Sequence, residues 1–157
     1  MKLLLTLLLI LLTTPLFSQR FKKQKFVERK IEGVYLGRIR STTGNYYVNL
    51  VALRFYKNGF VTAKWVSKKR KDFTGLANEL DLKLEQADVS KGTFSHPADH
   101  AVSIIFDRQK TTLGHNFAGS YKAPKSDKGP MEMQLDVIPH LKRKKSDGDY
   151  FVLLKRV

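Results

Sequence analysis

Two histidines close together are the first feature of this sequence that could carry chemistry. In the stretch FSHPADHAV, residues 94–102, His96 and His100 stand four residues apart with Asp99 between them. On one helical turn, side chains at this spacing lie on the same face and can bind one metal ion. The alternative is a polar loop that joins two strands.

A zinc site needs three or four ligands in a supported geometry, and this stretch supplies few. Pro97 allows one helical turn at most, because its ring cannot be accommodated inside a longer helix. Asp99 is the only nearby third ligand, and the chain has no His-Glu-x-x-His motif. The sequence therefore favours the loop over a metal-assisted enzyme, and we expect neither metal ligands nor a cofactor.

No catalytic motif stands out elsewhere in the chain. It lacks a Gly-x-Ser-x-Gly elbow, a phosphate-binding loop and a dinucleotide fingerprint. The 14 carboxylates are scattered, mostly at positions expected to be wet, and no pair stands out for acid–base catalysis. The sequence therefore favours a protein that is not an enzyme, and it predicts no catalytic residue.

The first 18 residues have the pattern of an export signal. Lys2 supplies a positive charge, residues 3–12 form an apolar run, and Pro15 and Ser18 precede the expected cut. The run is too short to span a bilayer comfortably, and Thr13 interrupts it, which speaks against a retained anchor. We therefore expect a signal peptide at 1–18, a periplasmic or secreted mature protein, and no membrane span.

The chain is strongly basic, with a formal net charge of +15 at pH 7. Such an imbalance attracts anionic partners, and salt weakens the attraction. Export makes lipopolysaccharide, acidic polysaccharide or anionic lipid a more natural partner than nucleic acid. We expect residues 19–32 to form a basic N-terminal arm. The chain contains no cysteine, so no disulfide can support the fold, which must rest on its hydrophobic core.

From Gly33 onward, short segments rich in β-branched and aromatic residues alternate with Gly, Asn, Asp and Pro, which is typical of strands. They are VYLGRIR, YYVNLVALRFY, FVTAKWV, AVSIIFD, HNFAGSY, MEMQLDVI and YFVLLKRV. The turn residues 57–59, Lys-Asn-Gly, predict a hairpin between the second and third segments. Apolar and polar residues alternate over 131–137, so one face of that strand should be buried and the other wet.

The stretch between the third of these segments and the next, residues 72–94, is ambiguous. Its apolar residues fit a helical stripe with Asp72 or Thr74 as the cap, and they are Phe73, Leu76, Ala77, Leu80 and Leu84. Leu80, Leu82 and Leu84 also alternate at the period of a strand. We expect one short helix and then a strand near residues 92–94. Counting that strand gives about eight antiparallel strands, which predicts an up-and-down β-barrel or a closely related sandwich.

This order of segments resembles the small exported lipocalin-like (calycin-type) β-barrel proteins of bacteria. Gly33 and Tyr35 match the Gly-x-Tyr that opens their first strand. The segment FYKNGFV, residues 55–61, matches their F-x-x-x-G-x-V hairpin at Phe55, Gly59 and Val61. The Gly-x-Trp form and the paired cysteines of many lipocalins are not present. The resemblance covers residues 31–157; it implies a barrel domain, here 33–157, that binds a small and often apolar ligand in its mouth, without a catalytic set.

If the strands run up and down in order, the end at which each link lies follows from strand number. Links after odd-numbered strands lie at one end, and links after even-numbered strands lie at the other with the N-terminal arm. The 96–100 loop then lies at the opposite end from His115 and His140, which removes the nearest further histidine ligands.

The same reasoning places the basic runs 68–71 and 142–145 together, with Arg108 and Lys110, at the end that holds the links after odd-numbered strands. Two such runs would make a positive rim that draws anions. The alternative is that the charges cap exposed loops and keep strand edges from pairing.

The candidate ligand-binding residues combine interior aromatic side chains with basic side chains of this rim. They are Tyr35, Phe55, Trp65, Phe117, Tyr121, Lys69, Arg70, Arg143 and Lys144. The sequence predicts an exported, non-catalytic binding protein that holds a small amphipathic or anionic ligand in a barrel cavity. Barrels of eight strands are either filled or hold one small ligand. The alternative is therefore an interaction protein with a filled barrel, which binds an anionic cell-envelope polymer through its basic surface.

Overall fold

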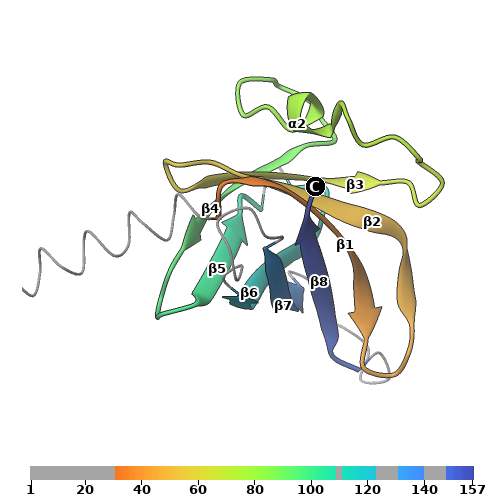
Figure 1. Ribbon diagram of the computed structural model, residues 1–157. Coiled ribbons are helices and arrows are strands. Elements are labelled where there is room, and N and C mark those ends of the chain that lie inside the picture. Colours follow the sequence, from red (N-terminus) through yellow and green to blue (C-terminus); the bar gives the residue numbers. More distant parts are fainter. Residues whose placement is uncertain (1–30, 109–110, 123–130, 140–147) are drawn as a thin grey trace, which may run out of the picture.

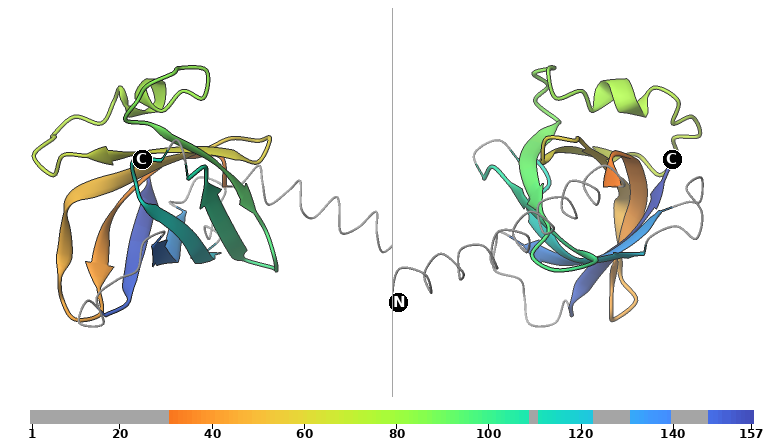
Figure 2. Two further views of the ribbon diagram at one scale, coloured as in Figure 1. Left: turned by 180° about the vertical axis from the view of Figure 1, so that it is seen from behind. Right: turned by 60° about the vertical axis from the view of Figure 1, so that its left-hand side comes forward.

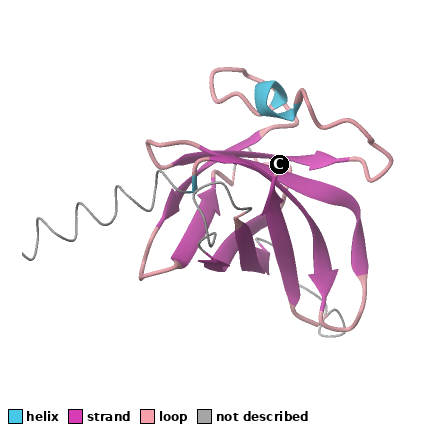
Figure 3. Ribbon diagram, in the orientation of Figure 1, coloured by secondary structure: helices cyan, strands magenta, loops and turns pink. Residues whose placement is uncertain are grey.

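A computed structural model describes residues 31–108, 111–122, 131–139 and 148–157 of the chain. The expected signal peptide, most of the basic arm and the basic run 142–145 lie outside these described residues. The described chain is mainly β, with one short helix outside the sheet (Figures 1 and 3). Within it, no helix has the length and apolar character needed to cross a membrane.

Eight antiparallel strands follow one another around a closed barrel in sequence order, and the last pairs with the first. They are β1 (Gly33–Ser41), β2 (Tyr46–Phe55), β3 (Phe60–Val66), β4 (Ser90–Ser95), β5 (Ala101–Phe106), β6 (His115–Lys122), β7 (Glu132–Pro139) and β8 (Tyr150–Arg156). The right-hand view of Figure 2 shows the strands closing into a ring. The predicted up-and-down barrel is confirmed.

Strand number therefore decides where each link lies. We call the end with the links after odd-numbered strands the rim end, and the end with the links after even-numbered strands the turn end. The predicted hairpin lies at the turn end: the Tyr56 amide donates to the Phe60 carbonyl at 3.0 Å, closing the turn between β2 and β3. Gly59 has a φ of +82°, a conformation that residues with a Cβ rarely adopt.

Alternate residues of the strands point into the barrel and fill it with apolar side chains. At the turn end three aromatic rings pack edge to face, with centroids 5.3 Å apart for Tyr35 and Phe55 and 5.1 Å apart for Phe55 and Phe94. The Tyr35 hydroxyl donates to the Met131 sulfur at 3.1 Å. Burial raises the pKa of Tyr35 to about 12, so the phenol is neutral at physiological pH.

A second, smaller core lies outside the barrel wall. The link between β3 and β4 carries α2 (Leu76–Glu79) and packs over β1, β2 and β3, above the barrel in Figure 1. Leu76, Leu80 and Val89 of the link bury outward-facing Ala52 and Val66 of the wall. The link therefore shields an apolar part of the outer face of these strands from water.

The short helix was predicted, but its predicted cap is wrong. Gly75 occupies the N-cap position and makes no side-chain capping bond. Asp72 instead accepts a hydrogen bond from the Thr74 amide at 2.8 Å, which closes a turn before the helix. Leu84 of the predicted stripe is 44 % exposed, because the chain leaves the wall after Leu80.

Polar contacts fasten this link to the wall. The Leu80 carbonyl, at the end of α2, accepts hydrogen bonds from the Tyr56 hydroxyl at 2.5 Å and the Thr62 hydroxyl at 2.6 Å. Glu79 receives two hydrogen bonds from Arg70, at 2.6 and 3.0 Å, and one from Lys64 at 3.1 Å. The hydrogen bonds from Arg70, followed by that from Lys64, lower the pKa of Glu79 to about 2.

This ion-pair cluster makes the free energy of unfolding depend on pH in the acidic range. The pKa of Glu79 is about 2 in the folded chain against an ordinary 4.5, so its contribution is complete above pH 4.5 and is lost as the pH falls towards 2. The variant Glu79→Gln should therefore lose less unfolding free energy than the wild type between about pH 5 and pH 2. Urea titrations at a series of pH values measure this. Glu85→Gln, which removes an exposed carboxylate, should keep the wild-type acid dependence; an equal slope for Glu79→Gln would contradict the prediction.

Candidate functional site

Four ring-bearing side chains meet inside the barrel at the rim end. Tyr47, His115 and Tyr150 stand at or near the starts of β2, β6 and β8, and Trp65 stands near the end of β3. The Tyr47 and Trp65 rings are stacked, with centroids 5.5 Å apart and planes 17° apart. The Tyr47 ring also contacts His115 and Tyr150 edge on, with centroids 5.5 and 5.4 Å away. We call these four residues the rim cluster.

Hydrogen bonds fix the rim cluster in place. The Tyr47 hydroxyl and the Nε2 atom of His115 lie 3.1 Å apart. The Trp65 indole donates to the Thr112 carbonyl at 3.4 Å, which ties β3 to the link between β5 and β6. His115 is buried, whereas Tyr47, Trp65 and Tyr150 are half-buried and pack against the inner core. Stacked and edge-on rings at these separations attract one another beyond the effect of burial.

Basic side chains stand at the same end. Lys68, Lys69 and Lys71 follow β3, Arg108 follows β5, and all four are exposed. Asp107 and Asp149 also lie at this end and lower its net positive charge.

Arg70 differs from its basic neighbours. Its guanidinium is bound to Glu79 and to the Asp72 carbonyl, so it anchors the outer link. The predicted rim residues thus divide into exposed Lys69, engaged Arg70, and Arg143 and Lys144, which lie outside the described residues.

The structure does not bring the five predicted aromatic residues together. Tyr35, Phe55 and Tyr121 lie towards the turn end, and Phe117 lies inside the barrel. All four are part of the packed inner core, with exposed fractions of 5 % or less. Trp65 stands half-buried at the rim end with the basic residues, and Phe117 lies buried at the same end, in contact with Phe106 at the end of β5.

Sequence reasoning missed Tyr47, His115 and Tyr150 as members of this site. Their positions in the strand order also predict the rim end for these residues. Strand order does not decide which of two adjacent residues points inward, since a one-residue slip reverses the face. Tyr46, next to Tyr47, points outward and packs against Arg40, whose guanidinium carbon lies 5.5 Å from the ring centroid.

The two histidines at residues 96 and 100 lie in the link between β4 and β5, at the turn end. The predicted polar loop is confirmed. Nδ1 of His96 lies 3.0 Å from the Ala101 carbonyl, to which it donates because a carbonyl oxygen can only accept. The His96 and His100 rings both face Tyr121, at 6.1 and 5.4 Å between centroids. Within the described ranges no three potential metal ligands gather, and His115 lies at the other end of the barrel.

Comparisons with protein-family models, with curated proteins and with solved structures return no match to this chain. The closed eight-stranded barrel agrees with the fold that the lipocalin-like resemblance implied. The rim cluster combines partly exposed aromatic rings with basic side chains at one end of this barrel.

Proposed function

We propose that the protein is an exported, non-catalytic binding protein that takes a small amphipathic or anionic ligand at the rim end of the barrel. The observation that carries this proposal is the half-buried Tyr47–Trp65 stack at the end of the barrel where the exposed lysines 68, 69 and 71 follow β3. An aromatic floor favours contact with a ring or an alkyl chain. Exposed ammonium groups nearby favour an anionic head group.

The packing of the inner core supports a ligand seat at the rim rather than deep inside. At the turn end, Tyr35, Phe55 and Phe94 contact one another and occupy the interior. At the rim end, three of the four rings are only half-buried, so a ligand can reach them with less rearrangement.

Native mass spectrometry of the mature protein from its own host, in low-salt buffer, would reveal a bound small molecule. A direct test uses laurate below its micellar range, because Trp65 is the only tryptophan and its fluorescence reports on the rim. We expect laurate to change this fluorescence and to bind at least about tenfold more tightly than dodecyltrimethylammonium, which has an alkyl chain of similar length and the opposite charge. Added salt should weaken the binding.

Matched variants locate the site. Tyr47→Ala should weaken laurate binding by about tenfold or more, because it removes the ring that stacks on Trp65. Phe60→Ala removes an exposed ring at the turn end and should leave the affinity unchanged. Unchanged binding to Tyr47→Ala, with the fold verified by circular dichroism, would contradict the proposal.

A second candidate function is binding of an anionic envelope polymer through the basic surface of a filled barrel. The net charge of +15 and the packed turn end favour it. Salt-sensitive binding of lipopolysaccharide that survives Tyr47→Ala and weakens when Lys68, Lys69 and Lys71 are changed to Gln would support this candidate over the first.

A further inference from the structure

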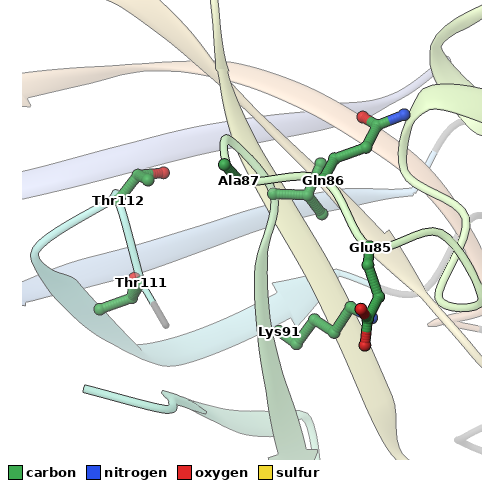
Figure 4. A pocket seen from close by; sticks show the side chains of 7 residues that line it. Glu85, Gln86, Ala87, Lys91, Thr111 and Thr112 are labelled. Atoms are coloured by element: carbon green, nitrogen blue, oxygen red, sulfur yellow. The ribbon is translucent and has the colours of Figure 1, made fainter. Parts of the chain in front are cut away.

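We infer that the protein has a second binding site, for a small zwitterionic ligand, in a groove outside the barrel. This inference goes beyond the proposed function and does not depend on it. The groove has a volume of about 430 Å³ and lies between the segment before β4 and the link between β5 and β6 (Figure 4). Its lining includes Glu85, Gln86, Val89, Lys91, Thr111 and Thr112. This volume is within the range of pockets that hold small molecules.

Hydrogen bonds hold the two sides of the groove together. The buried Ser90 hydroxyl accepts from the Thr112 amide at 2.9 Å and from the Thr111 hydroxyl at 3.0 Å. The Thr111 oxygen also accepts from the Leu113 amide at 3.2 Å, and the Thr112 hydroxyl donates to the Asp88 carbonyl at 3.3 Å. These bonds fix the shape of the groove and engage both threonine hydroxyls within the protein. The side chains left to meet a ligand are therefore those of the other lining residues.

Glu85 and Lys91 supply two opposite charges to the groove. In the part of the chain that the structure describes, neither side chain forms an ion pair. In the view of Figure 4 both extend towards the same part of the groove, while Thr111 and Thr112 stand across β4 from them. A carboxylate and an ammonium group without partners can each take an ion pair from a ligand.

The pairing of these charges selects the class of ligand. A simple anion drawn to Lys91 would be repelled by Glu85, and a simple cation would be repelled by Lys91. A ligand with both an ammonium and a carboxylate group satisfies both side chains. Buried Val89 adds an apolar surface to the groove, so the structure favours an amino acid with a small apolar side chain.

Three probes with the same side chain and different charges test this inference by NMR titration of the full mature chain. L-valine carries both charges, L-valinamide carries only the ammonium group, and N-acetyl-L-valine carries only the carboxylate. We expect L-valine to shift the amide signals of Val89, Thr111 and Thr112, and to bind about tenfold or more tightly than either analogue. Equal affinities for the three probes would overturn the inference, as would the absence of any shift at about 50 mM L-valine.

Variants with matched controls separate the groove from the rest of the surface. Glu85→Gln and Lys91→Gln should each weaken L-valine binding by about five- to tenfold, because each removes one ion pair. Glu132→Gln and Lys155→Gln remove the same two charges from a surface ion pair of 3.1 Å between β7 and β8, and should leave the affinity unchanged. Unaltered affinity in both groove variants would overturn the inference. Laurate binding should be unchanged in Glu85→Gln, which distinguishes this site from the rim.

Discussion

Gly37→Ala should destabilise the barrel by about 3 kcal/mol or more, since a core clash with backbone atoms has few ways to relax. Gly37 lies in β1 opposite Val51 of β2 and Leu154 of β8. A Cβ atom at this position would lie 2.2 Å from the Leu153 carbonyl oxygen and 2.9 Å from its carbonyl carbon. Neither atom can retreat unless β8 moves away from β1, which would break the pairing that closes the barrel.

Urea unfolding followed by circular dichroism measures this effect. The control is Gly75→Ala, because a Cβ there meets nothing closer than a Glu79 side-chain oxygen at 3.8 Å. That variant should cost no more than about 1 kcal/mol, because the added methyl group meets no close neighbour and only the N-cap position of α2 changes. If Gly37→Ala unfolded at the same urea concentration as Gly75→Ala, the close approach of β1 and β8 at Gly37 would not contribute to the free energy of unfolding.

Phe55→Ala should cost about 3–5 kcal/mol of unfolding free energy, the usual range for removing a buried phenylalanine ring. Phe55 is 1 % exposed and contacts both Tyr35 and Phe94 edge to face. Removing its ring leaves a cavity between two aromatic side chains that β1 and β4 hold apart. The loss of stability therefore includes the hydrophobic free energy of burying the ring and the attraction between the rings in contact.

The matched control for this prediction is Phe60→Ala, five residues along the chain. Phe60 is 43 % exposed, so its removal should cost no more than about 1 kcal/mol. Equilibrium unfolding monitored through Trp65, the single tryptophan, gives both values. Similar losses for the two variants would mean that the aromatic packing at the turn end contributes little to stability.

Much of this fold was predictable because its signals are local. In β7, buried Met133, Leu135 and Val137 alternate with exposed residues, as the sequence of that segment predicts. The Lys57-Asn58-Gly59 turn fixes the β2–β3 hairpin through a few neighbouring residues. Apart from the link that carries α2, successive strands are joined by short links, which leave few alternatives to an up-and-down order. The number of strands and their topology follow from such patterns.

The outer link and the site were harder to predict, because each depends on contacts between distant residues. Leu76 and Leu80 are buried against the outside of β2 and β3, a surface that the pattern of residues 72–94 does not reveal. The rim cluster forms because particular side chains point into the barrel. The sequence alone does not decide whether Tyr46 or its neighbour Tyr47 is the inward one. In the sequence, Arg70 cannot be told apart from the lysines around it. Its structural role is visible only from its ion pair with Glu79.

The strands of the barrel are paired over unequal lengths, and this has a consequence for how the wall opens. Each of the β3–β4, β4–β5 and β5–β6 pairings joins four residue pairs, whereas β6 and β7 share eight. The outer link buttresses β1 to β3 and does not extend over β5 (Figure 1). Local fluctuations concentrate where few interactions must break, so backbone amides of β4 and β5 should exchange with deuterium before those of β1 and β2. The wall should therefore open first along β4 and β5, while the longer pairings of β1 with β2 and of β6 with β7 stay closed.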